Sequence, residues 1–171
     1  MKANKLISNS LISGLLPQAA NNPRSRTHHN IHDSYNEKVQ RFLNVIEYAS
    51  YVRPHYHNEQ DAWEGFIIIK GHLSILQFDH SGILVDRNEL SPEGPLFGIE
   101  LDSTFPHCIT SLSDQAIVFE YKQGPYLPDN DKTFPQWAPT EQDTQVKIYH
   151  QWMKTAAVGE RFKSDKISNS Q

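Results

Sequence analysis

The sequence predicts an all-β domain, built as a sandwich or small barrel, with a short helix near each end of the chain. Between residues 51 and 121, short runs rich in β-branched and aromatic residues alternate with Gly, Pro, Asp and Ser. Many short strands at this spacing are typical of a sandwich or barrel and not of strand–helix–strand units. With 171 residues and 37% hydrophobic content, the chain suits one compact domain with its own core.

The first helix is expected over residues 8–20, where apolar residues recur at helical spacing. Those residues are Leu11, Leu15, Leu16 and Ala19. Ser8 or Ser10 can cap the helix, and Pro17 is expected to kink or split it. The polar stretch that follows, PRSRTHHNIHDS, has no hydrophobic period, which indicates an extended loop.

Residues 39–47 fit two different structures. Ser34 and Glu37 form a capping box ahead of apolar residues at helical spacing, whereas Val39, Leu43 and Val45 also share one face of a strand. Periodicity leaves both interpretations open.

The predicted strands beyond residue 50 are YVRPHYH, GFIIIKG, HLSILQF, ILVDRNEL, GIEL, HCITSL and AIVFEY. A loop rich in Pro and Asp follows over residues 123–139, and an amphipathic helix carries Val146, Tyr149, Trp152 and Met153. The polar tail from Gly159 is expected to be disordered. The chain thus divides into a helix and polar loop that pack on the barrel (1–38), the barrel (39–126), and a C-terminal loop, helix and tail (127–171).

Charge and composition exclude several classes of protein. The formal charge of -4 offers no basic field for nucleic acid. No apolar stretch approaches the roughly 20 residues of a membrane span. Cys108 is the single cysteine, which excludes an internal disulfide framework and suits a reducing compartment, so we expect a cytoplasmic protein. A small molecule is the expected partner.

The stretch RPHYHNEQDAWEGFIIIKG predicts a metal site. His55 and His57 lie two apart on an extended segment, so both imidazoles leave the same face. Glu64 opens the next strand, and a hairpin would bring its carboxylate beside them. His107 begins the later strand HCITSL and completes the set. A lone histidine in a strand is more often a hydrogen-bonded polar residue, but this spacing favours metal binding.

Three imidazoles and one carboxylate suit one divalent transition metal, namely Fe(II), Mn(II), Ni(II), Co(II) or Zn(II). Four protein ligands on a six-coordinate ion leave about two positions for water or a bidentate substrate. That openness favours chemistry or ligand binding over a structural ion.

The spacing of His55, His57, Glu64 and Gly71 resembles the first cupin motif, and residues 98–107 are similar to a degenerate second one. The resemblance implies a jelly-roll-like double-stranded β-helix barrel with the metal inside one end. This sequence departs from the usual pattern. Six residues separate His57 from Glu64 where three or four are usual, Asp102-Ser103-Thr104 replaces a Pro-x-Gly turn, and Ser111 replaces a terminal Asn.

A closer resemblance is to the WbuC-type cupin-fold metalloproteins, which occur with genes for O-antigen and other surface polysaccharides. It spans PRSRTHHNIHDS, VQRFLNVIE, YVRPHYH, ELSPEGPLFGIEL and EYKQGPYLPDNDKTFPQWAP. The resemblance implies that residues 39–47 form a strand leading into the barrel. It implies a fold and a metal site but no reaction.

Further candidates surround the predicted metal. The polar loop carries Arg24, Arg26, Asn30 and His32, which either fold over the barrel mouth to hold phosphate or sugar hydroxyls or belong to a solvated arm.

Four more residues are candidates in the barrel and after it. Arg53 shares a face with His55 and is expected to clamp an anion. Glu120 and Lys122 face a polar cavity or form a surface ion pair, and Tyr126 stacks on a sugar or packs on the barrel.

Three functions compete. The first is a metal-dependent isomerase, epimerase, lyase or oxygenase acting on a sugar or nucleotide-sugar. Because Glu64 would be a ligand, His32 or Lys122 would then carry the proton. The second is a metal-dependent module that binds or senses such a molecule, and the third is a structural barrel with an empty site. A homodimer that pairs through a sheet edge, the first helix or residues 39–47 is also expected.

Overall fold

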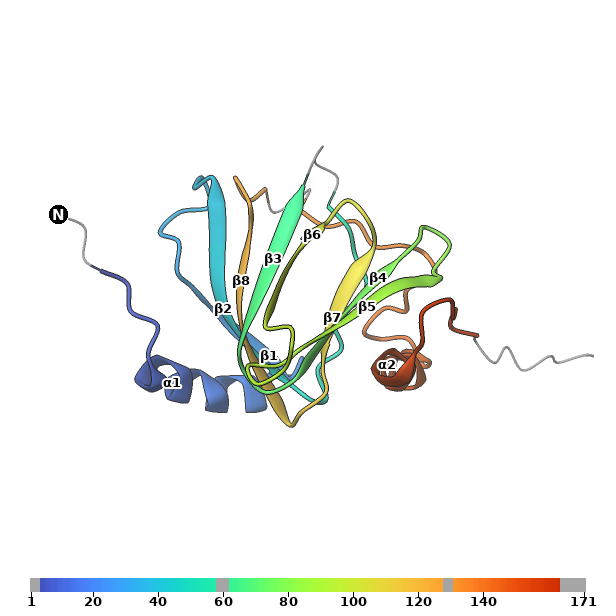
Figure 1. The fold of residues 1–171 in the computed structure, drawn as a ribbon, viewed down its shortest axis with the longest axis horizontal. Helices are drawn as coiled ribbons and strands as arrows, with labels where there is room; N and C mark the ends of the chain where they lie inside the picture. Colours follow the sequence, from blue (N-terminus) through green and yellow to red (C-terminus); the bar gives the residue numbers. More distant parts are fainter. Residues whose placement is uncertain (1–3, 58–61, 128–130, 164–171) are drawn as a thin grey trace, which may run out of the picture.

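The computed structural model describes residues 4–57, 62–127 and 131–163 and consists of two antiparallel sheets that face each other (Figure 1). The first sheet has five strands in the order β1 (Arg26–Asn30), β2 (Val39–Glu47), β8 (Gln115–Gln123), β3 (Trp63–Lys70) and β6 (Gly98–Asp102). The second has three strands in the order β5 (Leu84–Leu90), β4 (Leu73–Phe78) and β7 (His107–Ser111). All pairings are antiparallel, as expected for a sandwich or barrel.

The apolar core lies between the two sheets. Phe66 and Ile68 of β3 and Val118 of β8 meet Ile75 of β4 and Ile109 of β7, all of them buried. Because alternate residues of a strand point to opposite faces, the same strands direct Glu64, Glu120 and Lys122 into the interior farther along. One end of the barrel interior is therefore apolar and the other is polar.

Each sheet carries one helix on its outer face. Helix α1 (Asn9–Ala20) packs Leu15 and Ala19 against Leu43, Val45 and Ile117 of the five-stranded sheet. Its N-terminal cap is Ser8, whose hydroxyl accepts a 3.2 Å hydrogen bond from the Leu11 amide. One helix runs through Pro17, so the predicted split does not occur.

Helix α2 (Val146–Thr155) covers the three-stranded sheet. Tyr149 and Met153 pack against Leu76 and Phe78 of β4 and Cys108 of β7. The burial of Cys108 in this layer agrees with the predicted core position.

Two predictions from the sequence are wrong. The polar stretch read as a loop contains strand β1, which pairs with β2 in the register Arg26↔Ile46 to Asn30↔Phe42. The tail is ordered as far as residue 163, because Arg161 bridges Ile83 and the Phe162 ring lies 4.9 Å from that of Tyr149. The rest of the predicted tail, residues 164–171, lies outside the described residues.

Residues 39–47 form a strand, as the family resemblance implies. That strand, β2, is bonded to β1 on one side and β8 on the other. It therefore offers no free edge, and the homodimer stays a prediction. The edges of the five-stranded sheet are β1 and β6. Among the described residues, no helix has both the length and the apolar character needed to span a membrane.

Candidate metal centre

Four side chains converge between the two sheets: His55, His57, Glu64 and His107. One ligand atom from each lies within 4.8 Å of all the others, and all four residues are buried. Glu64 comes from β3 of the first sheet and His107 from β7 of the second. The two remaining histidines precede β3 on a segment that runs along β7. The four residues that the sequence spacing singled out therefore meet in one place.

Backbone pairing positions the two histidines of the H-x-H motif. His55 exchanges two backbone hydrogen bonds with His107, of 3.0 and 2.8 Å, and the His57 amide donates to the Ser103 carbonyl at 2.8 Å. Because the segment is extended, both imidazoles leave the same face. Tyr56 between them pairs outward with Thr133 of the Pro-rich loop.

Each imidazole uses Nδ1 for a backbone carbonyl. His55 Nδ1 bonds the Arg53 carbonyl at 3.0 Å, His107 Nδ1 bonds the Phe105 carbonyl at 2.9 Å, and His57 Nδ1 bonds the Asp131 carbonyl. A carbonyl only accepts, so each Nδ1 carries the proton and each Nε2 is left to bind a ligand. Hydrogen bonds from the ring nitrogen that does not bind the metal orient metal-bound histidines in proteins.

The Nε2 atoms fit a cation. Those of His55 and His57 are buried and have no hydrogen-bond partner among the described residues. His107 Nε2 lies 2.9 Å from a Glu64 carboxylate oxygen, and His57 Nε2 lies 3.5 Å from the same oxygen. Buried polar atoms without partners are costly, and one divalent ion among these atoms would satisfy all of them.

The charge states of the cluster suit a metal. Burial alone would raise the pKa of Glu64, but the contacts with His107 and His57 outweigh burial and hold it well below its usual range. Burial lowers the pKa of His55 well below its usual range, and Lys132 and His107 add to that effect. A carboxylate and a neutral imidazole are the forms that bind metals.

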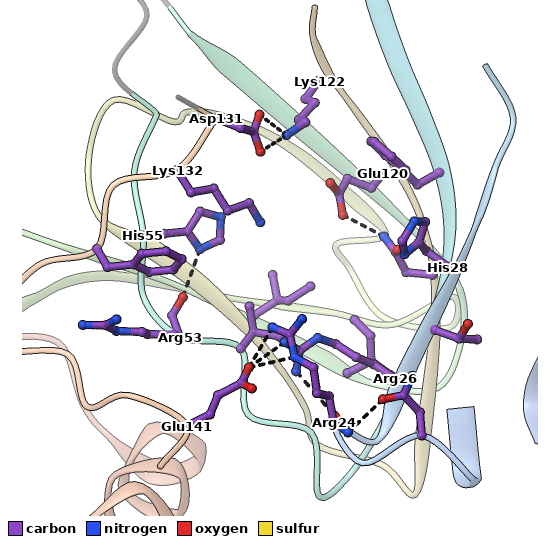
Figure 2. Close-up of a pocket in the computed structure, with 18 of the residues that line it drawn as sticks. Arg24, Arg26, His28, Arg53, His55, Glu120, Lys122, Asp131, Lys132 and Glu141 are labelled. Atoms are coloured by element: carbon purple, nitrogen blue, oxygen red, sulfur yellow. Dashed lines mark hydrogen bonds and ion pairs between the residues drawn. The ribbon is translucent and has the colours of Figure 1, made fainter. Parts of the chain in front are cut away.

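A cavity of about 810 Å³ adjoins the cluster, and His55 forms part of its wall. This volume is in the range of small-molecule sites. The inward faces of β1, β2 and β8 line one side, and the Pro-rich loop lines the other. Figure 2 shows His55, Lys122, Asp131 and Lys132 toward one end of the cavity, and Arg24, Arg26 and Glu141 toward the other.

Most of the predicted binding residues lie on this wall. They are Arg24, Arg26, Asn30, Arg53, Glu120, Lys122 and Tyr126. The Lys122 ammonium donates to both oxygens of Asp131, at 2.6 and 2.8 Å, and lies 5.1 Å from the centre of the Tyr126 ring. Glu120 accepts from the Asn44 amide at 2.7 Å, and burial, with the nearby Glu64 carboxylate, raises its pKa to about 8. The roles predicted for these residues stay predictions.

Two candidates do not point into the cavity. His32 is not among the described residues that line it, and its Nδ1 lies 3.0 Å from both the amide and the carbonyl of Arg41. Arg53 reaches the wall, but its guanidinium donates to the Ala138 carbonyl at 3.1 Å and lies 4.7 Å from the centre of the Phe134 ring. In Figure 2 that guanidinium points away from the cavity, so it ties down the Pro-rich loop and is not aimed at an anion.

Sequence reasoning missed several wall residues, among them His28, Asn44, Asp131, Lys132 and Glu141. His28 lies between Arg26 and Asn30 on the inward face of β1, a spacing of two that was present in the sequence. Asp131 and Lys132 come from the Pro-rich loop and Glu141 follows it, and no regular spacing there marks an inward side chain. Burial lowers the pKa of Lys132, which the Glu64 and Glu120 carboxylates oppose.

Comparison with known proteins gives a fold and a family of undefined role. Residues 7–90, just under half of the chain, match a family described as a domain of unknown function (DUF6016). No curated protein sequence matches this chain.

Three solved structures illustrate the structural similarity. An oxalate oxidase in complex with the substrate analogue glycolate has a TM-score of 0.50 at 11% identity, over 67% of this chain and 57% of its own. An RmlC-like cupin family protein with a double-stranded β-helix fold from Methanocaldococcus jannaschii has a TM-score of 0.45 at 17% identity, over 61% of this chain and 86% of its own. An HTH_3 family transcriptional regulator from Vibrio cholerae has a TM-score of 0.46 at 15% identity, over 68% of this chain and 60% of its own.

The structure has the fold class predicted from the sequence, an all-β barrel of two facing antiparallel sheets, and the similarity to the oxalate oxidase at a TM-score of 0.50 agrees with it. This chain spans about three-fifths of the length of the Vibrio cholerae regulator and of the oxalate oxidase. Structural similarity at such low sequence identity is evidence for the fold and not for a function. The buried His55, His57, Glu64 and His107 form a group that could hold a metal ion.

Proposed function

We propose that this protein holds one divalent transition metal at His55, His57, Glu64 and His107, and that a small oxygen-rich molecule reaches the metal from the adjoining cavity. One observation carries the proposal: His55 belongs both to the ligand cluster and to the cavity wall, and its Nε2 has no partner among the described residues. A ligand in the cavity would therefore lie next to a residue that holds the metal.

The donor set supports Fe(II), Mn(II), Co(II), Ni(II) or Zn(II), because imidazole and carboxylate together suit metals of intermediate softness. When bound, such an ion would supply Lewis acidity toward a carbonyl or hydroxyl oxygen of the ligand. Glu64 is then a ligand and not a free base. Glu120 and Lys132, both on the cavity wall, are groups that can accept or donate a proton.

An enzyme of the isomerase, epimerase, lyase or oxygenase type is our first candidate, acting on a sugar or nucleotide-sugar. The resemblance to WbuC-type proteins supports a place in surface-polysaccharide synthesis, and the single buried Cys108 suits the reducing cytoplasm.

A non-catalytic binding or sensing module is the second candidate. The observation that favours it is that Lys122, the lysine predicted to carry the proton, is already paired with both oxygens of Asp131.

Metal analysis tests the shared part of both candidates. Protein purified without chelator or nickel resin should carry about one equivalent of metal, and the His55→Ala/His57→Ala double variant should carry almost none. His29→Ala is the matched control, because His29 is exposed on β1 and lies outside the cluster. A wild-type content near zero, or an unchanged content in the double variant, would refute the proposal.

Turnover separates the two candidates. The protein reconstituted with Fe(II), Mn(II) or Zn(II) should convert a sugar nucleotide if it is an enzyme, and Glu120→Gln should lower that rate without lowering the metal content. Saturable binding of the same compound with no product under any of the metals would favour the binding module.

A further inference from the structure

The polar cavity has an excess of positive charge at the end away from the metal. Figure 2 places Arg24 and Arg26 there, with Glu141 beside them. Three contacts from the two arginines reach the same carboxylate oxygen of Glu141: Arg24 Nε at 2.8 Å, Arg24 Nη2 at 2.7 Å and Arg26 Nη2 at 3.0 Å. Two guanidinium groups thus share one carboxylate, which leaves a net positive charge.

Arg26 is fixed in place before any ligand arrives. Its Nη1 donates to the Tyr51 carbonyl at 2.8 Å and to the Ser50 hydroxyl at 3.2 Å. Arg26 Nε and Arg24 Nη1 have no bond to the described residues, so donors remain for an anion. A guanidinium whose geometry is already fixed loses little entropy when it binds a carboxylate or phosphate.

Glu141 is a weak competitor for such an anion. Its side chain is 32% exposed and that of Arg24 is 58% exposed. Solvent screens ion pairs at this exposure, so they contribute little. A carboxylate or phosphate group of a ligand can therefore join or displace Glu141 at small cost.

One wall residue of β1 suits a ligand with hydroxyl groups. Asn30 lies on the wall, and its buried side-chain oxygen has no hydrogen-bond partner among the described residues. An acceptor in this position needs a donor from the ligand. A hydroxyl supplies one, and it can also accept from a neighbouring donor such as His28.

We propose that the ligand of this cavity is a hydroxylated organic anion, such as a sugar carrying a carboxylate or a phosphate. Its hydroxyl oxygens lie toward the metal and Asn30, and its anionic group lies between Arg24 and Arg26. The inference rests on the proposed function for the metal end. It adds the charge of the ligand and the direction in which the ligand lies.

Three sugars with the same ring test it by calorimetry: glucose, glucuronate and glucose 6-phosphate. They differ only at C6, which is neutral, a carboxylate or a phosphate. Metal-loaded protein should bind at least one charged sugar about tenfold more tightly than glucose, because charge-assisted hydrogen bonds are the stronger ones. Whichever charged sugar binds more tightly identifies the anionic group.

Variants locate the anion. Arg24→Gln should remove most of the preference for the charged sugar, and Glu141→Gln should increase it several-fold because a competing carboxylate is gone. The control Lys147→Gln, which removes one positive charge from an exposed residue of α2, should leave the preference unchanged. If the anion bound the metal instead, Arg24→Gln would leave the preference intact, and the inference would be wrong.

The remaining outcomes are also decisive. Equal binding of all three sugars, or no binding of either charged sugar at millimolar concentration, would overturn the inference. Metal content measured on the same samples keeps the two proposals apart. A metal-free wild type that still prefers the charged sugar refutes the proposed function alone, whereas a fully loaded protein with no such preference refutes this inference alone.

Discussion

Replacement of Lys122 by Met should weaken metal binding even though Lys122 is not a ligand. The Lys122 ammonium holds both oxygens of Asp131, and the side chains are only 7% and 12% exposed. The Asp131 carbonyl in turn accepts from His57 Nδ1. Lys122 therefore fixes the residue that orients one metal-binding imidazole.

The size of the effect follows from what Lys122→Met leaves behind. A buried carboxylate that loses its partner costs about 3–5 kcal/mol. Movement of residue 131 toward solvent relieves that cost, but it takes the acceptor away from His57. Loss of such an orienting contact lowers metal affinity about 10–100-fold.

Competition between the protein and a chelator of known affinity measures the change, with Co(II) as a metal whose absorption also reports its geometry. Lys122→Met should lose about 10–100-fold in metal affinity. The control Lys70→Met, which removes the same charge from an exposed residue, should lose none. The Lys122→Met/Asp131→Asn double variant should recover much of the loss, because no buried charge is then unpaired. Wild-type affinity in Lys122→Met, or a double variant no better than the single, would show that the contact does not position His57.

Four further outcomes are expected. Chelator treatment should lower the melting temperature, because the partnerless Nε2 atoms then stay buried; an unchanged melting curve would argue against a bound ion. Gly71→Ala should cost about 2 kcal/mol in urea unfolding, because Gly71 has φ +85° and an added methyl group meets the Gln115 carbonyl oxygen; a neutral effect would show that the turn adapts. Met153→Ala should cost about 3 kcal/mol, because Met153 is fully buried between α2 and the three-stranded sheet. Burial lowers the pKa of His150 to about 4, so the unfolded chain binds its proton first and stability should fall by about 1–2 kcal/mol from pH 6.5 to 4; His150→Gln should flatten that decline.

The sheets and helices were largely predictable because their inward faces are apolar. Phe66, Ile75 and Ile109 lie in short runs rich in apolar and β-branched residues, and Tyr149 and Met153 recur at helical spacing. Strand β1 escaped prediction for the opposite reason. Its inward residues face a polar cavity, so the alternation is between two kinds of polar side chain and carries no hydrophobic signal.

The metal ligands were predictable because their chemistry lies in side chains at fixed spacing. The groups that orient them were not, since backbone carbonyls such as those of Arg53, Phe105 and Asp131 have no signature in sequence. Arg53 itself shows the limit of reasoning from strand alternation. Its long side chain turns toward carbonyls of the Pro-rich loop. The alternation of side chains along a strand does not determine where the end of such a long side chain lies.

The position of β1 at the edge of its sheet has a consequence for how this protein could be altered. Arg26, His28 and Asn30 form part of the cavity wall, yet none of them belongs to the three apolar clusters among the described residues. Substitutions there change what the cavity recognises while the packing between the sheets and the metal ligands stay intact. A library of variants limited to the inward positions of this one strand is therefore a direct route to new ligand preferences on an unchanged scaffold.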